Sequence, residues 1–161
     1  MIAARPADIN QPPRVMAVAR FERLFRRAAG LDVDKSDLRR YSDFVNRKLH
    51  DLLVVAEETA RRDGRKAIEP FHLPITKGLQ RCIDEFRQLN EEVELNSILD
   101  HLAARPPLKL PYSDELESLF PVIVGGLSVA LAHSFKILDP ELKNPATEHW
   151  QRSLQIFELL L

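Results

Sequence analysis

The sequence predicts an all-α protein in which a short, a long and a short helix occur twice in series. Apolar residues recur at three- and four-residue steps, which is the helical period and not the two-residue period of a strand. Capping residues and helix-stopping glycines and prolines fall at the ends of these segments. The pattern divides the chain into a first unit, residues 14–90, and a second, divergent unit, residues 91–161, after an N-terminal tail, residues 1–13, that is expected to be disordered.

The first unit is organised around residues 34–69, which are predicted to form one long amphipathic helix followed by a basic loop. Asp34 or Ser36 is the expected N-cap, and Gly64 is the expected left-handed stop after two arginines. No proline or glycine interrupts the apolar stripe, which consists of Leu38, Tyr41, Phe44, Val45, Leu49, Leu52, Leu53 and Ala56.

Two shorter helices flank the long one. The segment 15–29 repeats the helical period and is closed by Gly30, with arginines on the positions outside its apolar stripe. After the basic loop, Pro70 and Pro74 suit the first turn of a helix that reaches about Leu89, because a missing N–H costs little in a first turn.

The second unit repeats this plan with different residues. A short helix is predicted over 93–104, a long one from the cap Ser113 to Leu138, and a last one after the cap Thr147. The uncharged run 119–132 has two interpretations, a membrane span or a central helix covered by its neighbours. The second is favoured because a membrane span needs about 20 apolar residues, more than the run 119–132 contains. Gly125 and Gly126 would then allow another helix to cross closely.

Charge is distributed unevenly along the chain. The net charge of −1 alone argues against a generic nucleic-acid binder. Residues 1–90, however, hold 18 Lys and Arg against 13 Asp and Glu, a net of +5, whereas residues 91–161 hold 5 against 11, a net of −6. The single cysteine, Cys82, excludes an internal disulfide and fits a reducing cytoplasm.

Residues 60–68, ARRDGRKAI, resemble the end of the long helix of archaeal histones, which closes with a basic turn, Gly-Arg-Lys-Thr-Ile, before a third short helix. This likeness extends over the helix plan of residues 14–90. The chain also resembles bacterial proteins with two histone folds in one chain, in which the second fold is divergent and the two pair as an intramolecular pseudo-dimer. The resemblance therefore implies tandem histone folds, although residues 91–161 match in plan only.

The resemblance also implies where DNA would bind. Histone folds pair antiparallel along their long helices, so that two pairs of loops each contact DNA phosphates. One pair would join Arg65 and Lys66 to Lys109, with no local acid until Glu69. The other pair would bring together Lys35, Lys143, Asp32, Asp34 and Glu141 and is the weaker site. The first helix would lie between the pairs and add Arg14, Arg20, Arg23 and Arg27.

The implied function is non-specific binding and local bending of double-stranded DNA by a cytoplasmic, nucleoid-associated protein. No element that could read bases is visible, so no sequence specificity is expected. The slope of log affinity against log salt concentration should be about −0.9 for each phosphate contact. Three positions depart from the family's loops. Ala67 stands for a threonine, His72 for the aspartate that clamps the loop arginine, and Asp32 for a minor-groove arginine.

Two other functions remain open. The same fold could serve as a protein–protein interaction module that has lost DNA binding, which the acidic second half favours, or the chain could self-associate through the apolar residues 157–161. No catalytic motif is recognised, so neither enzyme activity nor a small-molecule substrate is expected. The five histidines are not spaced as metal ligands are, so no metal is expected. No cofactor and no membrane partner are expected either.

Overall fold

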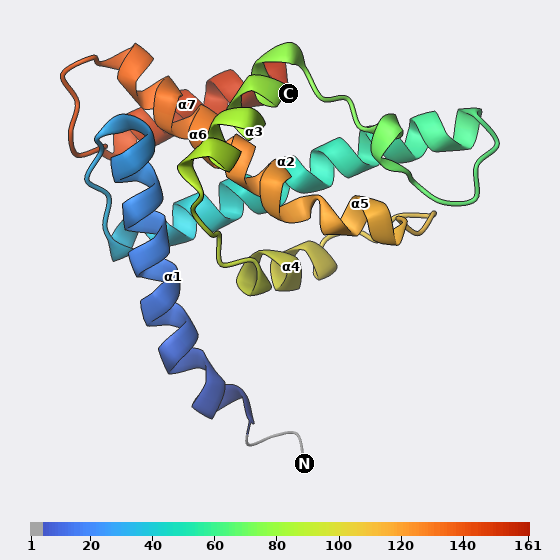
Figure 1. Cartoon of the computed structure of the whole chain (residues 1–161), viewed down its shortest axis with the longest axis horizontal. Coiled ribbons are helices and arrows are strands. Elements are labelled where there is room, and N and C mark those ends of the chain that lie inside the picture. Colours follow the sequence, from blue (N-terminus) through green and yellow to red (C-terminus); the bar gives the residue numbers. More distant parts are fainter. Residues whose placement is uncertain (1–4) are drawn as a thin grey trace.

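The computed structural model of the chain describes the backbone of residues 5–161 and the side chains from Ala17 onward. Within these residues the protein is all-helical, as predicted, and contains one isolated β-bridge. The elements are α1 (Arg5–Ala29), α2 (Lys35–Arg62), the 3₁₀ turn η1 (Pro70–His72), α3 (Lys77–Leu89), α4 (Asn96–Ala103), α5 (Asp114–Ser118), α6 (Phe120–Leu138) and α7 (Thr147–Leu160) (Figure 1).

The molecule is built around the crossing of α2 and α6. In Figure 1, α2 runs along the long axis of the molecule and α6 passes across it. Tyr41 of α2 and Ser128 of α6 share a buried hydrogen bond of 2.7 Å between their hydroxyl groups. Burial raises the pKa of Tyr41 to about 12, against the smaller lowering effect of Ser128, so the phenol stays protonated and able to donate near neutral pH.

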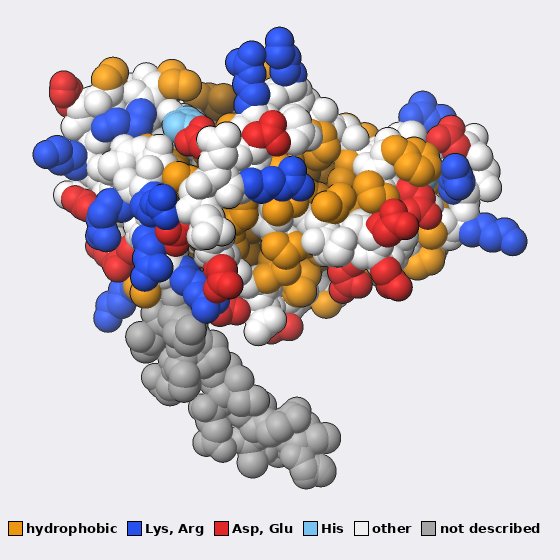
Figure 2. All heavy atoms as spheres, viewed as in Figure 1, with side chains coloured by type: hydrophobic (Ala, Val, Ile, Leu, Met, Phe, Trp, Pro, Cys, Tyr) orange, Lys and Arg blue, Asp and Glu red, His pale blue; other side chains and the backbone are white. Residues whose placement is uncertain are grey.

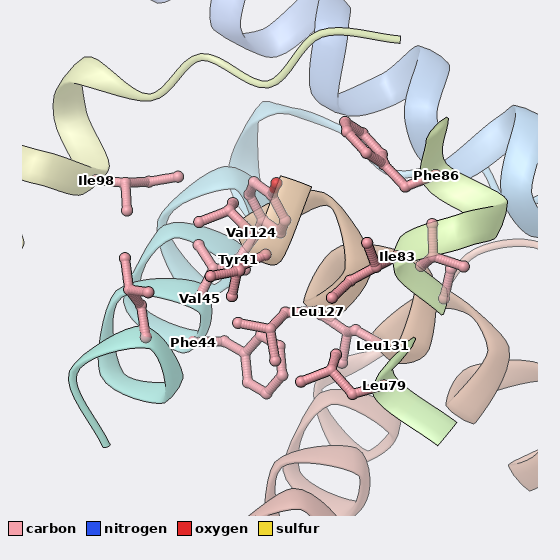
Figure 3. Close-up of a cluster of buried hydrophobic side chains, with 14 of the residues drawn as sticks. Tyr41, Phe44, Val45, Leu79, Ile83, Phe86, Ile98, Val124, Leu127 and Leu131 are labelled. Carbon is pink, nitrogen blue, oxygen red and sulfur yellow. The ribbon is translucent and has the colours of Figure 1, made fainter. Parts of the chain in front are cut away.

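One hydrophobic core joins the two halves of the chain. Figure 3 shows its centre, where residues of α2, α3 and α6 meet and Ile98 of α4 approaches from one side. Because each helix presents one apolar stripe, burial of these stripes against one another supplies the main stabilising term. The labelled members are Tyr41, Phe44, Val45, Leu79, Ile83, Phe86, Ile98, Val124, Leu127 and Leu131.

Helix α6 is the central helix of this core. It is long and apolar enough to cross a membrane by length and composition, but 56% of its most apolar window is buried inside the protein. Helix α3 packs directly on Gly125 and Gly126, where a Cβ atom would overlap with the ring of Phe86 or with Ile83 Cγ1. The two glycines thus permit the close helix crossing that the sequence predicted.

The caps of α2 are confirmed. Asp34 accepts a hydrogen bond of 2.8 Å from the Ser36 N–H, and Gly64 has φ +71°. Helix α1, in contrast, begins at Arg5, before the predicted start at residue 15, so the disorder expected for residues 5–13 is wrong, and residues 1–4 of the predicted tail lie outside the described part.

Several other boundaries differ from the prediction, among them the start of α4, at Asn96 instead of residue 93. The second long helix is divided at Leu119 into α5 and α6, because Pro121 has no N–H to continue the ladder from α5. Helix α3 is capped by Thr76, with Pro70 in η1 instead of in its first turn. Helix α7 begins at Thr147, and the Ala146 N–H donates to His149 Nδ1 at 2.9 Å.

Candidate nucleic-acid interface

The basic loop after α2 lies beside the loop before α5. The Ile68 N–H donates to the Pro111 carbonyl oxygen at 2.8 Å, and the Ser113 N–H donates to the Ile68 carbonyl oxygen at 3.0 Å. These bonds make the isolated parallel bridge between Ile68 and Tyr112. Ile68 itself is fully buried, so the two loops are fixed at one end of the molecule. We call this arrangement the basic loop pair, residues 61–69 with 107–113.

Glu57 of α2 anchors the second segment of the basic loop pair. Its carboxylate oxygen Oε2 accepts hydrogen bonds from the N–H groups of Lys109 and, at 2.8 Å, of Leu110. The expectation that no acid lies near this site before Glu69 is therefore wrong. The sequence does not reveal this contact, because Glu57 and the loop that it holds are distant in the chain. The carboxylate is engaged with backbone donors and does not pair with the Lys109 ammonium.

Glu57→Ala is expected to destabilise the protein by about 1–2 kcal/mol, because hydrogen bonds to a charged group are stronger than neutral ones but this site is partly exposed. Urea unfolding would measure the loss. Glu58→Ala is the matched control, since Glu58 is the neighbouring exposed carboxylate. Equal stability of the two variants would show that Glu57 does not hold the loop.

Five cations are exposed at the basic loop pair. Arg65, Lys66 and Lys109 are all exposed, as their predicted role requires. Arg61 and Arg62, in the last turn of α2, are also exposed there and were not among the predicted site residues. Figure 2 shows the Lys and Arg side chains spread over this end of the molecule, on the right, with acidic side chains between them.

Arg65 is held by an aromatic ring and not by a carboxylate. Its guanidinium carbon lies 5.1 Å from the ring centroid of Phe71, within the range of a cation–π contact. His72, where the resemblance to archaeal histones would place a clamping aspartate, is buried and accepts a hydrogen bond of 2.9 Å from the Glu69 N–H at Nδ1. Its Nε2 is 3.7 Å from Asp63 Oδ2. His72 therefore holds the shape of the loop but forms no ion pair with Arg65.

The second loop pair is also in contact. The Asp32 N–H donates to the Lys143 carbonyl oxygen at 2.7 Å, so residues 31–35 lie beside 140–144. Lys35 and Lys143 are exposed. Acidic groups lie in the same segments. Asp32 pairs with Arg26, with 3.7 Å between Nε and Oδ1, and hydrogen bonds from Ser36 lower the pKa of Asp34, which keeps that carboxylate charged. This end therefore offers anions little net attraction.

The arginines of α1 are engaged by acids of the chain itself. The segment 90–95 between α3 and α4, which we call the glutamate linker, runs along α1. Arg27 Nη1 lies 2.6 Å from Glu91 Oε2 and donates to the Leu89 carbonyl oxygen at 2.7 Å. Further ion pairs join Arg20 to Glu92 at 3.4 Å and to Glu94 at 3.3 Å, and Arg23 to Glu91 at 3.8 Å.

This pairing changes the predicted role of the first helix. Arg20, Arg23 and Arg27 were predicted as free phosphate ligands, but each has a glutamate within 4 Å, so phosphate must compete with an internal anion. Glu91 is especially well placed, since its side chain is only 8% exposed. The side chain of Arg14 lies outside the described residues. In Figure 2 the blue side chains beside α1 alternate with red ones.

A shallow cleft of about 170 Å³ between α2 and α7 is the other place where cations gather, including Arg40 and Arg47. The buried Lys48 at its base pairs with Glu158 at 2.8 Å and with Asp51 at 3.2 Å. The hydrogen bond from Lys48 lowers the pKa of Glu158. Lys48 is thus compensated by two carboxylates. Among the described residues, no three His, Cys, Asp or Glu side chains come together as a metal site.

Comparison with solved structures supports the fold. A crystal structure of a protein from Thermus thermophilus is 54% identical, has a TM-score of 0.85 and matches 89% of this chain and 97% of its own. A crystal structure of a protein from Aquifex aeolicus is 24% identical, with a TM-score of 0.79 over 95% of this chain and 99% of its own, and shows likeness of fold alone.

Sequence relatives cover most of the chain as well. Two proteins of Aquifex aeolicus (strain VF5), both described as uncharacterized proteins, are 27% and 30% identical. The first match covers 86% of this chain and 81% of the relative, and the second covers 80% and 82%. A family model matches residues 21–158, from the middle of α1 almost to the end of α7. The chain therefore belongs to the family described as a domain of unknown function, DUF1931.

Proposed function

We propose that the chain is a tandem histone fold, with units 14–90 and 91–161 paired as a pseudo-dimer, that binds double-stranded DNA without sequence specificity. The observation that carries this proposal is the basic loop pair. Hydrogen bonds through Ile68 bring the loop after one long helix against the loop before the other, and Arg65, Lys66 and Lys109 are exposed there. The contact between Asp32 and Lys143 supplies the corresponding second loop pair.

DNA binding is expected to rest mainly on the basic loop pair. Its cations can neutralise phosphates, and Lys and Arg contacts to phosphates position a protein on the duplex without reading bases. The α1 arginines contribute less, because the glutamate linker already pairs with them. With about three to five phosphates neutralised, affinity should be modest and should fall steeply as salt rises. We further propose that such a protein acts at the nucleoid in the cytoplasm, bending DNA locally.

The double substitution Arg65→Ala/Lys66→Ala tests the proposal. It is expected to weaken binding to random duplexes equally across sequences and to reduce the slope of log affinity against log salt by about 2, since each lost phosphate contact removes about 0.9. Fluorescence anisotropy from low to physiological salt would measure both. Lys35→Ala/Lys143→Ala removes the same charge at the second loop pair and is expected to have a much smaller effect. Absence of binding by the wild-type protein at the lowest salt would refute the proposal.

The alternative, a protein–protein interaction module, is favoured by a different observation. Leu159 and Leu160 at the end of α7 are 83% and 69% exposed, although they are large and apolar. A pull-down from lysate with and without nuclease distinguishes the two functions, because partners retained after nuclease treatment support the protein module. Sedimentation at two protein concentrations would detect self-association through this end of α7.

A further inference from the structure

Phe71 is unlike the other phenylalanines whose side chains the structure describes. It is 65% exposed, whereas the rest are buried or partly buried in the core. It is placed there by its neighbours: Pro70 begins the 3₁₀ turn η1, and the buried His72 follows it. The ring of His72 lies 4.3 Å from the ring of Phe71, at an angle of 52° between the planes. Phe71 is therefore presented to solvent from a fixed base.

Two exposed cations belong to the loop that precedes Phe71. Arg65 lies over its ring at 5.1 Å, and Arg65 and Lys66 belong to the same loop. This contact places the guanidinium next to the exposed aromatic surface instead of leaving it to move freely. An aromatic ring with one cation above it and other exposed cations nearby has two capacities at once, since it can stack with a flat π-system and attract the phosphate attached to it.

We propose that Phe71 and Arg65 form a stacking platform for an unpaired nucleobase of DNA. Proteins that bind single strands combine cations that follow the backbone with aromatic side chains on which bases stack, and any base can stack because each has a π-face. Bases inside an intact duplex are already stacked on one another and do not reach this ring. The platform thus favours DNA in which a single-stranded segment adjoins the duplex held by the basic loop pair.

This inference rests on the proposed DNA binding and extends it to a class of DNA. It also gives the His72 side chain a purpose in the loop. His72 fixes the Glu69 N–H and supports one side of Phe71, so the platform is held by buried groups and not by surface contacts alone. Arg65 then serves two parts of the ligand, the phosphate and the base.

The test compares a blunt duplex with the same duplex carrying a single-stranded oligothymidine extension. The wild-type protein is expected to bind the extended duplex about tenfold more tightly at equal salt, as one or two stacked bases would give. Phe71→Leu keeps an apolar side chain but loses the π-face, and it is expected to abolish this preference. Its affinity for the blunt duplex should change far less, because Arg65 loses its contact with the ring but keeps its charge. Phe71→Trp is expected to retain the preference. Thermal unfolding of the Leu variant should match the wild type, since the ring is mostly exposed.

The outcomes separate the inference from the proposed function. A wild-type protein without preference for the extension, or a Leu variant that keeps the preference, overturns the platform, while loss of blunt-duplex binding in Arg65→Ala/Lys66→Ala still supports the DNA-binding loop pair. Failure to bind either DNA overturns both. Unchanged DNA binding by the Leu variant with loss of a protein partner would instead assign Phe71 to a protein contact.

Discussion

The triple substitution Glu91→Gln/Glu92→Gln/Glu94→Gln is expected to increase the affinity for random duplex DNA about tenfold at low salt and to steepen its salt dependence. In the wild-type protein, Arg20 and Arg27 lie 3.3 and 2.6 Å from glutamate oxygens, so a phosphate must displace an anion that is already in place. Glutamine removes that competing charge but keeps the shape of the side chain and an oxygen that accepts hydrogen bonds. Each arginine that then gains a phosphate should add about 0.9 to the salt slope.

A control separates this local effect from net charge. Asp43→Asn/Asp100→Asn/Glu148→Gln removes the same number of negative charges at acids that do not pair with α1 arginines in the described part of the chain. Both triple variants should stay folded, because the arginines are at least partly exposed and glutamine keeps an oxygen that accepts their hydrogen bonds. A larger gain in the linker variant supports competition. Equal gains in affinity in both variants would show that the gain comes from net charge alone. No gain in either would show that the α1 arginines do not reach DNA.

Most of the fold could be predicted because its signals are local. The limits of α2 follow from a capping aspartate, an unbroken apolar stripe and Gly64, which lie within one segment of the chain. The division of the second long helix was missed because a proline is tolerated in a first turn, so Pro121 alone does not tell whether a helix starts there or continues from Ser113.

The candidate site was less predictable because it depends on contacts between distant segments. The exposure of Arg65 and Lys66 was expected, and their adjacency to residues near Lys109 came from the family resemblance. The pairing of α1 with the glutamate linker was not foreseen, although the run of glutamates at 91–94 was visible in the charge distribution. Periodicity identifies which side of α1 is polar, but it does not show which distant segment lies against that side. The exposure of Phe71 was equally hidden, because a single aromatic residue in a loop carries no periodic signal.

Gly126→Ala is expected to destabilise the protein by about 2 kcal/mol, the second large effect that the structure implies. An alanine in the middle of a helix normally stabilises it by about 1 kcal/mol relative to glycine. Here the added Cβ would overlap with Ile83 Cγ1 and lie 3.1 Å from the backbone nitrogen of Ile83. The Ile83 side chain can change rotamer, but the α3 backbone cannot move without separating α3 from α6. We therefore expect a steric cost of about 3 kcal/mol, near the upper end of the range for overpacked cores, of which the gain in helix propensity offsets about 1 kcal/mol.

Gly78→Ala is the matched control for this prediction. Gly78 is a helical glycine of α3 with no atom within 4 Å of its would-be Cβ, so the same substitution is expected to leave the free energy of unfolding unchanged or slightly increased. Urea unfolding of both variants gives the comparison. Gly125→Ala should also destabilise the protein, because the three atoms nearest to its Cβ belong to the ring of Phe86, which is itself buried. A Gly126→Ala variant as stable as Gly78→Ala would mean that α3 does not cross α6 this closely. The packing between the first and second halves of the chain would then have to be revised.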